Sequence, residues 1–211
     1  MRPTHLIFLR HGQTDANLAQ RMQGHHDVPL NAVGREQASQ AADWLADRDL
    51  ASIYASDLSR ASQTGEIVAA VHGLPVVTDP RLREMNVGDW EGRHISDVLR
   101  EKPDFVQLYL AGIDFRRSAT GETIAEMVAR AMPAVTEIIR RHAGQSVVIA
   151  LHGLLGVQLI QTLLGMAPAS RVLGSLGNAC YSEVGTFDGA AWLVTHNIAP
   201  HRLDPAASFH R

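Results

Sequence analysis

Several features that assign a chain to a specialised class of protein are missing from this sequence. Its 211 residues include a single cysteine, Cys180, so a disulfide within the chain is impossible and no cysteine-rich metal motif is present. No segment approaches the roughly 18 consecutive apolar residues of a membrane span. The apolar run at 6–9 is also too short for a signal peptide. We therefore expect a soluble, cytoplasmic protein without a membrane among its partners.

An excess of charge of one sign is missing as well. The formal net charge is −3, and the basic residues form no long run. Since binding to nucleic acid depends on basic patches, nucleic acid is not an expected partner. The hydrophobic content of 45% and the charged content of 19% are ordinary for a globular protein. The chain length fits one core, and we expect a single domain over residues 1–211.

Short apolar runs rich in Val, Ile and Leu alternate with longer segments of helical periodicity. The runs predict buried strands at 6–9, 51–55, 74–78 and 147–151, and the periodic segments predict helices at 32–48, 58–71, 123–142 and 154–164. Thr123 and Glu126 form a capping-box pattern, and Pro133 inside that helix is expected to kink it. The alternation predicts an α/β fold whose mostly parallel central sheet is flanked by helices on both faces.

Two segments depart from this alternation. Residues 183–198 contain two strand-like runs around the turn signal Phe187-Asp-Gly-Ala190, which predicts an antiparallel pair at the sheet edge near the C-terminus. This apolar hairpin offers an edge for homodimer formation. Residues 86–120 are less regular, and we interpret them as a cap-like insertion over the site. The last residues, 200–211, are expected to form a loose tail.

Two of the apolar runs end in the same dipeptide. The run at 6–9 continues into Arg10-His11-Gly12, and the run at 147–151 continues into His152-Gly153. Ligands of open α/β sheets bind at the carboxyl ends of the strands, so both imidazoles face one crevice if these two strands are neighbours. Arg60, in the first turn of the helix after 51–55, is expected at the same edge.

Two guanidiniums and two imidazoles around one crevice predict an oxyanion pocket, with phosphate as its ligand. Free N–H groups at the start of the following helix are expected to add to this anion site. A lone histidine or arginine in such a place is more often a capping or solvated residue. The prediction therefore rests on the whole set of four residues at predicted strand ends.

These residues resemble the signature of the histidine phosphatase superfamily, also called the phosphoglycerate mutase-like family. The resemblance runs in the family's order from residue 6 to about 155. It is carried by Leu9-Arg-His-Gly-Gln-Thr14, Asn17, Gln23-Gly24, Leu30, Gly34-Arg35, Ser56-Asp-Leu-Ser-Arg-Ala61, Thr64, Arg81-Leu-Arg-Glu84, Gly88-Asp-Trp-Glu-Gly92, Gly121-Glu122 and His152-Gly153.

The resemblance implies a role for each site residue. His11 is expected to attack phosphorus and form a phosphohistidine, which splits one displacement into two easier steps. Glu84 is expected to be the general acid and base, although without the resemblance it reads as a solvated loop residue. Expected holders of the phosphoryl group are Arg10, Arg60 and His152, and expected substrate contacts are Thr14, Asn17, Gln23, Gly24 and Gly153.

No metal or other cofactor is implied, since the eleven histidines include no H-E-x-x-H or similar motif. His25 and His26 are interpreted as solvated loop residues near the pocket mouth. Arg116 and Arg117, in the expected cap, are close enough in sequence to meet a substrate carboxylate together. Two such arginines are more often a solvated face, which is the interpretation adopted for them.

The resemblance leaves two activities open. Mutases of the family protect the phosphohistidine from water, whereas phosphatases admit water to it. Mutases carry a longer insertion with Tyr-Gly and Leu-Asn-Lys patterns, and the short segment after Gly88-Asp-Trp-Glu-Gly92 indicates the phosphatase branch. Within it, the chain is similar to broad-specificity phosphatases and to glucosyl-3-phosphoglycerate phosphatases. We expect a metal-independent hydrolase of small phosphomonoesters; the alternatives are a phosphoglycerate mutase and a catalytically inactive member that binds a phospholigand or a protein.

Overall fold

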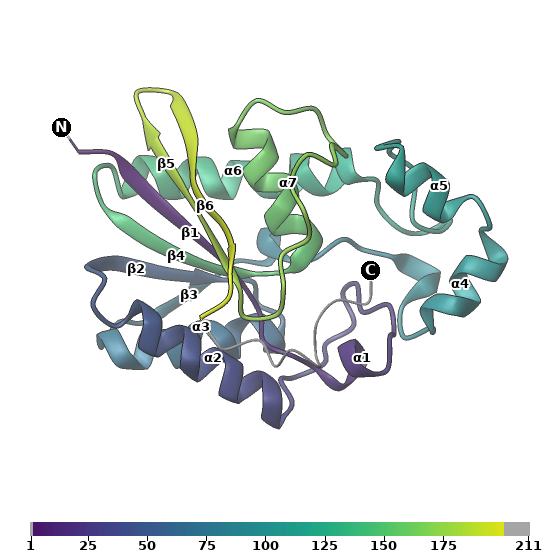
Figure 1. Cartoon of the computed structure of the whole chain (residues 1–211), viewed down its shortest axis with the longest axis horizontal. Helices are drawn as coiled ribbons and strands as arrows, with labels where there is room; N and C mark the ends of the chain where they lie inside the picture. The colour runs from purple at the N-terminus through teal and green to yellow at the C-terminus, as the bar shows by residue number, and fades with distance from the viewer. Residues whose placement is uncertain (1, 201–211) are drawn as a thin grey trace.

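The computed structural model describes residues 2–200, in which a single six-stranded sheet has the order β3-β2-β4-β1-β5-β6. Residues 201–211 of the expected tail lie outside the described residues. Strands β1 to β4 pair in parallel, and β5 and β6 add an antiparallel edge, which confirms the predicted fold (Figure 1). The strands are β1 (Thr4–Arg10), β2 (Leu50–Ala55), β3 (Val76–Thr78), β4 (Ser146–Leu151), β5 (Tyr181–Phe187) and β6 (Ala190–Ile198).

Four long helices cover the sheet, and each begins within one residue of its predicted start. They are α2 (Ala32–Leu45), α3 (Ser59–His72), α6 (Ile124–Arg141) and α7 (Gly153–Leu163). The capping box at the start of α6 is present as predicted. The helix is 18 residues long, and Pro133 lies within it without ending it. Within residues 2–200, no helix combines the length and the apolar character that crossing a membrane requires.

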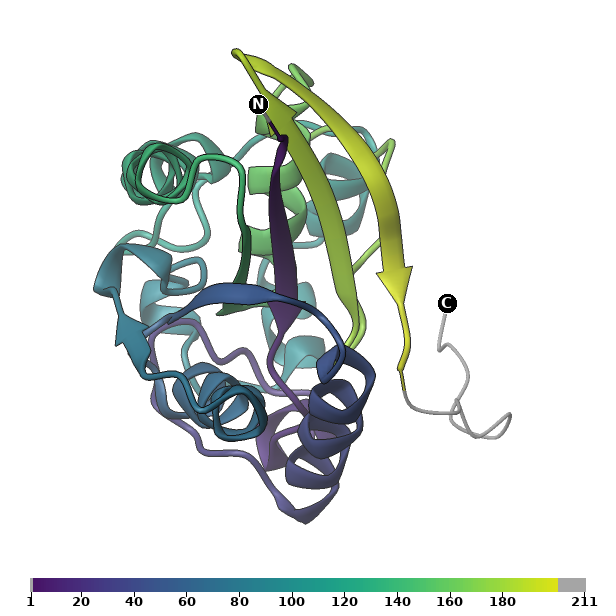
Figure 2. The ribbon, with the colours of Figure 1, turned by 90° about the vertical axis from the view of Figure 1, so that its left-hand side faces the viewer.

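Both faces of the sheet are buried at its central strands β1 and β4, which explains why these strands are continuous apolar runs. Successive side chains of a strand point to opposite faces. Leu6 and Phe8 of β1 therefore pack toward α6 and α7, whereas Ile7 and Leu9 pack toward α2 and α3. Figure 2 shows these two helix pairs on opposite sides of the sheet.

The pairing of β1 with β4 brings the two His-Gly sequences together. Arg10, the last residue of β1, lies opposite Leu151, the last residue of β4. The N–H of His11 continues the ladder by donating to the Leu151 carbonyl oxygen at 2.9 Å. On the other side of β4, the Ser56 N–H after β2 donates to the Ala150 carbonyl oxygen at 2.9 Å. Three strands consequently end at one edge of the sheet, as the sequence predicts.

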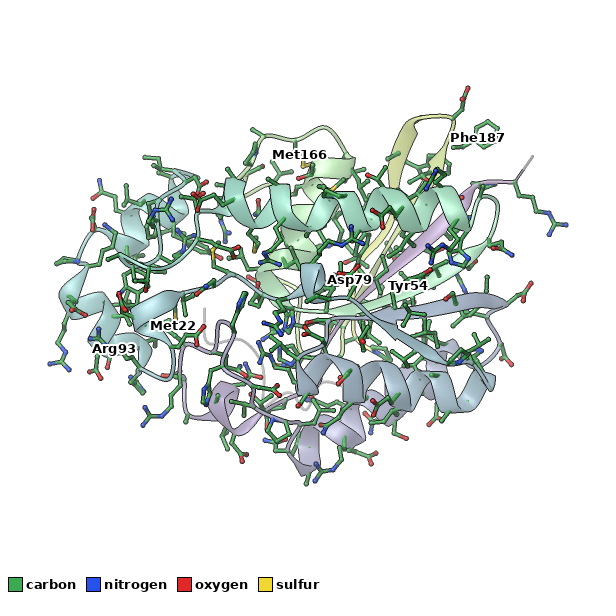
Figure 3. The ribbon with its side chains drawn as sticks, turned by 180° about the vertical axis from the view of Figure 1, so that it is seen from behind. Met22, Tyr54, Asp79, Arg93, Met166 and Phe187 are labelled. Atoms are coloured by element: carbon green, nitrogen blue, oxygen red, sulfur yellow. The ribbon has the colours of Figure 1, made fainter. Side chains whose placement is uncertain are left out.

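Residues 86–120 lie beyond the carboxyl ends of these strands (Figure 1). They contain a short 3-10 helix, η2 (Gly88–Trp90), and two short helices, α4 (Ile95–Glu101) and α5 (Phe105–Leu110). The Met22 N–H donates to the Arg93 carbonyl oxygen at 2.9 Å and joins this segment to the loop after α1 (Asp15–Leu18). Figure 3 shows Met22 and Arg93 side by side at this end of the molecule.

The hairpin of β5 and β6 turns at the opposite end. Asp188 and Gly189 both have positive φ angles, of 49° and 79°, which is the pattern of a type I′ turn. Phe187, at the tip, points away from the body of the protein (Figure 3). Use of this edge for a homodimer stays a prediction.

The start of α2 packs against the backbone that follows His11. Asn31 caps α2 by accepting from the Gly34 N–H at 2.9 Å, and this places Gly34 directly on residues 12 and 13. A Cβ atom at Gly34 would overlap the Gln13 backbone, and one at Gly12 would overlap the Gly34 backbone. Only glycine therefore allows this approach.

Replacing Gly34 with alanine is expected to lower the free energy of unfolding by at least about 2 kcal/mol, because two backbone segments must separate to admit one methyl group. Urea denaturation measures the loss. Gly174→Ala is the matched control, since a Cβ atom there meets nothing within 4 Å. Equal losses for the two variants would contradict the close packing of α2 on the residues after His11.

Candidate active site

A cavity of about 300 Å³ lies at the carboxyl edge of the parallel strands. Residues 86–120 and the loop before β5 form its outer wall. Eight of the ten predicted site residues line it, namely Arg10, His11, Asn17, Gln23, Gly24, Arg60, Glu84 and Gly153. Thr14 and His152 are not among its lining residues, and both side chains are fully buried.

The orientation of His11 is fixed by its own neighbour. Its Nδ1 lies 2.7 Å from the Gly12 carbonyl oxygen, and a carbonyl can only accept a hydrogen bond. Nδ1 therefore carries the proton, and the lone pair is on Nε2, for which no hydrogen-bond partner is found within residues 2–200. Burial lowers the pKa of His11 well below its usual range, and the charges of Arg10 and Arg60 lower it further. The imidazole is consequently neutral, which a nucleophile requires.

Arg10 and Arg60 are held by backbone carbonyls and not by carboxylates. Arg10 donates to the Leu176 carbonyl oxygen at 2.6 Å, and Arg60 donates to the Gly24 and His26 carbonyl oxygens at 2.8 and 2.9 Å. The Nε atoms of both arginines are buried without a partner. Burial lowers the pKa of each guanidinium. The two positive charges are thus fixed in place but not neutralised.

His152 packs against His11, with 5.3 Å between the ring centroids and an edge-to-face angle of 63°. Its side chain is completely buried, and neither ring nitrogen has a hydrogen-bond partner among residues 2–200. Buried polar atoms are rarely left unpaired in proteins. Burial lowers the pKa of His152 well below its usual range, and the nearby charges of Arg60 and Arg10 act in the same direction. A neutral His152 still offers one N–H group as a donor.

Glu84 lies at the N-terminus of α7 and lines the same cavity as His11. Its Oε2 accepts from the Leu154 N–H at 3.1 Å, and its Oε1 accepts from the Leu155 and Met85 N–H groups at 3.0 and 2.9 Å. The expectation of free N–H groups at the start of this helix is therefore wrong for Leu154 and Leu155. The positive end of α7 is already occupied by a carboxylate of the protein itself.

Thr14 connects two residues that line the cavity, Asn17 and Gln23. As the N-cap of α1 it accepts from the Asn17 N–H at 3.1 Å, and its hydroxyl lies 3.1 Å from Gln23 Oε1. Asn17 Oδ1 in turn accepts from the Thr14 N–H at 3.1 Å. Thr14 therefore positions Asn17 and Gln23, and it does not face the cavity.

Two expectations about charged loop residues need correction. His26 is exposed as expected, but His25 is half-buried, and its Nε2 lies 2.9 Å from the Glu84 carbonyl oxygen. Arg116 is exposed and pairs with Glu126. Arg117 is buried and lines the cavity, so the solvated interpretation is wrong for this residue. The folding of 86–120 over the strand ends places it there.

Asn178, on the loop before β5, supports His11 and was not identified from the sequence. Its Nδ2 lies 3.1 Å from the His11 carbonyl oxygen, 3.2 Å from the Gly12 carbonyl oxygen and 3.3 Å from Asn17 Oδ1. The Gly12 carbonyl that orients the imidazole is thus itself held in place. No sequence signal separates this asparagine from an ordinary loop residue, because its partners are backbone atoms distant in sequence.

The free energy of unfolding is expected to decrease as the pH is lowered below about 6.5, the ordinary pKa of histidine. Above that pH, His11 and His152 are neutral in both the folded and the unfolded state. Below it, the unfolded chain takes up protons that the folded site excludes, because burial lowers both pKa values. The loss is at most about 1.4 kcal/mol per pH unit for each imidazole.

Urea unfolding at several pH values between neutral and mildly acidic checks this dependence. His152→Gln is expected to reduce the slope of the free energy of unfolding against pH. Glutamine does not titrate, so the unfolded variant takes up one proton fewer than the unaltered chain. His26→Gln, at an exposed histidine of a neighbouring loop, serves as the control and is expected to keep it. An unchanged slope in His152→Gln would contradict the neutral, buried state of this imidazole.

The variant Asn178→Asp is expected to lower kcat by at least about tenfold, because a carboxylate oxygen replaces the amide donor opposite three oxygen acceptors and displaces Gly12 and His11. Steady-state hydrolysis of an aryl phosphate measures the effect. Asn197→Asp is the matched control, since Asn197 uses its Oδ1 to accept from the Gly177 N–H at 2.8 Å and aspartate keeps that acceptor. Equal kcat values in both variants would remove Asn178 from the site.

Comparison with known proteins agrees with this geometry. The family model of the histidine phosphatase superfamily (branch 1) matches residues 6–199. A probable phosphoglycerate mutase GpmB of Yersinia enterocolitica is 35% identical over 190 residues, which cover 90% of this chain and 88% of that protein.

Solved structures with similar folds carry names of phosphatases. A mycobacterial glucosyl-3-phosphoglycerate phosphatase, in complex with VO3, has a TM-score of 0.82 and 34% identity, covering 92% of this chain and 98% of that one. A putative alpha-ribazole-5'-P phosphatase from Escherichia coli has a TM-score of 0.81 and 28% identity, covering 93% and 97%. The chain belongs to the histidine phosphatase superfamily, and it is an enzyme that acts as a phosphatase.

Proposed function

We propose that this phosphatase hydrolyses small phosphomonoesters without a metal ion, through a phosphohistidine formed on His11. The observation that carries the proposal is the orientation of the His11 imidazole, whose Nδ1 faces the Gly12 carbonyl oxygen. Within residues 2–200, its Nε2 has no hydrogen-bond partner, and Arg10 and Arg60 bind backbone carbonyls and no carboxylate. A neutral nucleophile between two fixed cations matches a phosphorus centre that carries negative oxygens. Neither cation needs rearrangement when the phosphoryl group arrives.

In the first step, Nε2 of His11 attacks phosphorus, and the bond from phosphorus to the ester oxygen breaks. Glu84 gives its proton to the departing alkoxide, so that a neutral alcohol leaves. The phosphoryl oxygens accept hydrogen bonds from Arg10 and Arg60, and the unpaired buried N–H of His152 supplies a further donor.

In the second step, water attacks the phosphohistidine. Glu84, now a carboxylate, takes a proton from the attacking water, and the bond between phosphorus and Nε2 breaks. Inorganic phosphate leaves, and His11 and Glu84 return to their starting states. The three N–H groups that Glu84 accepts hold it in position through both steps.

The substrate is proposed to be a small phosphorylated metabolite. The cavity volume of about 300 Å³ admits a small molecule and no large one. The names of similar structures include glucosyl-3-phosphoglycerate and alpha-ribazole-5'-P as substrates of those proteins. A glucosyl-3-phosphoglycerate-type ester, or a broad range of esters, is therefore the class that we propose to test first.

The name of the Yersinia relative favours phosphoglycerate mutase activity as a second candidate. A mutase must keep water from the phosphohistidine and return the phosphoryl group to a second hydroxyl. Conversion of 3-phosphoglycerate to 2-phosphoglycerate, followed with and without 2,3-bisphosphoglycerate, tests this candidate. Isomerisation faster than phosphate release would make mutase the principal activity.

Two variants test the covalent mechanism in the presence of EDTA. His11→Gln is expected to lose at least about a thousandfold in the hydrolysis of p-nitrophenyl phosphate, because the attacking lone pair is gone. Glu84→Gln is expected to release a rapid burst of nitrophenol and then stall, since this leaving group needs no acid but water still needs a base. Acid-quenched protein is expected to carry acid-labile phosphate in Glu84→Gln and none in His11→Gln.

His26→Gln is the control, because the exposed His26 lies on a neighbouring loop without contributing a side chain to the cavity wall. It is expected to hydrolyse the ester like the unaltered protein. Equal rates in His11→Gln and the unaltered protein would eliminate the covalent role of His11. Loss of all activity with EDTA would eliminate the metal-independent reaction.

A further inference from the structure

Arg130, on α6, binds the backbone of the segment that carries Glu84. Its Nη1 donates to the Arg81 and Arg83 carbonyl oxygens at 2.7 and 3.0 Å, and its Nη2 donates to the Glu84 carbonyl oxygen at 3.1 Å. Its Nε and Nη2 also donate to the two carboxylate oxygens of Glu122, both at 2.9 Å. These bonds use all five N–H groups of a guanidinium, so none is left for a substrate.

Glu122 binds the other end of segment 81–86. Its Oε2 accepts from the Asn86 N–H at 2.9 Å, and its own N–H donates to the Asn86 carbonyl oxygen at 2.8 Å. Burial alone would raise the pKa of the Glu122 carboxyl, but the hydrogen bonds from Arg130 and from the Asn86 N–H outweigh it and lower the pKa. An ionised Glu122 therefore pairs with Arg130, and together the two side chains hold the backbone on both sides of Glu84.

The helix that carries Arg130 is firmly packed, whereas the segment that it binds has no regular structure. Met127, Ala131 and Ala134 of α6 are buried in the core beneath the helix. Residues 83–87 belong to no helix or strand. Backbone groups outside regular structure depend on side chains or water for their hydrogen bonds. Arg130 and Glu122 supply such bonds and thereby attach segment 81–86 to a rigid element.

Glu84 is consequently held at its backbone as well as at its carboxylate. Its carbonyl oxygen accepts from Arg130 and also lies 2.9 Å from His25 Nε2. Its carboxylate accepts from the Leu154 and Leu155 N–H groups of α7. A general acid must lie within hydrogen-bond distance of the oxygen that it protonates, and a displacement of about 1 Å can cost about a hundredfold in rate. A shift of this backbone is therefore expected to affect proton transfer directly.

We propose that Arg130, fixed by Glu122, is a positioning residue that keeps Glu84 aligned with the leaving alcohol and with the attacking water. The inference rests on the proposed function, in which Glu84 is the general acid and base. Arg130 is not among the residues that line the cavity, so it acts through the backbone of residues 81–84 and touches no reacting atom.

Phosphate monoesters whose alcohols differ in pKa test the proposal. p-Nitrophenolate leaves without a proton, whereas an alkoxide needs one, so alignment of the acid affects mainly the alkyl esters. Arg130→Met is expected to lower kcat/KM for alkyl phosphates by at least about tenfold more than for p-nitrophenyl phosphate. The loss is expected to grow with the pKa of the alcohol along the series.

A residue that only stabilised the fold would change the amount of active protein and reduce kcat/KM for every ester by the same factor. Equal losses along the series, or no loss for any ester, would therefore overturn the proposal. Arg130→Lys covers the case in which Arg130→Met does not fold. Lysine keeps the charge beside Glu122 but has three N–H groups in place of five, so the same dependence on the alcohol is expected with a smaller loss.

Combining variants assigns the effect to Glu84. In Glu84→Gln no acid remains to be aligned, so the addition of Arg130→Met is expected to lower kcat/KM for alkyl phosphates by less than about threefold. A further loss as large as the one that Arg130→Met causes in the unaltered protein would overturn the proposal, because Arg130 would then act independently of Glu84.

Arg81→Met is the matched control. The Arg81 guanidinium joins the same segment to α6 by donating to Glu137 at 2.9 and 2.8 Å, and within residues 2–200 it makes no hydrogen bond to residues 83–86. Arg81→Met is expected to show no dependence of its loss on the pKa of the alcohol. An equal dependence in Arg81→Met and Arg130→Met would overturn the assignment to Arg130.

Glu84→Gln alone separates failure of the inference from failure of the proposed function. If its loss grows with the pKa of the alcohol while that of Arg130→Met does not, the positioning role is overturned and the acid role of Glu84 stands. If Glu84→Gln hydrolyses every ester like the unaltered protein, the acid role of Glu84 is overturned, and the positioning role with it.

Discussion

The hydrogen bond from His11 Nδ1 to the Gly12 carbonyl oxygen is the contact on which the geometry of the site depends. It selects the tautomer and so decides which nitrogen is available to a substrate. The carbonyl is fixed in turn by the Asn178 side chain and by the contact between Gly12 and Gly34. One imidazole is therefore held in place by strand pairing, by the start of α2 and by the loop before β5. These contacts explain why a nucleophile on a loop can be rigid.

The second constraint is that the site contains buried positive charges that no carboxylate among residues 2–200 pairs with. This constraint links the stability of the fold to its function. The guanidiniums of Arg10 and Arg60 are buried without an ion pair among residues 2–200, and hydrogen bonds to backbone carbonyls hold them in place. Carboxylate partners would stabilise the empty site and compete with a phosphate. Burial lowers the pKa values of His11 and His152, and the same charges lower them further, so both imidazoles are neutral. The arrangement that gives the site its affinity for an anion thus lowers the stability of the protein when no anion is bound.

Much of the fold and of the inner site could be predicted from the sequence, because both rest on local patterns. Apolar runs marked the strands of the sheet, and periodicity marked the four long helices. The topology rule for ligand sites then brought Arg10, His11 and Arg60 to one edge before any contact was known. The roles of Asn178 and Arg117 were not predicted. That of Asn178 depends on contacts with residues distant in sequence, and that of Arg117 depends on the burial of an irregular segment.

The position of Glu84 shows most clearly how tertiary structure changes the chemistry that a motif suggests. A helix that begins at a strand end normally offers its N–H groups to a phosphate. Here the Leu154 and Leu155 N–H groups of α7 are bound by Glu84, so the helix positions a carboxylate instead. Anion binding then falls to the side chains of the cavity, among which arginines outnumber carboxylates. Because side chains vary independently of the fold, specificity for the leaving alcohol can change while His11 and the sheet stay the same.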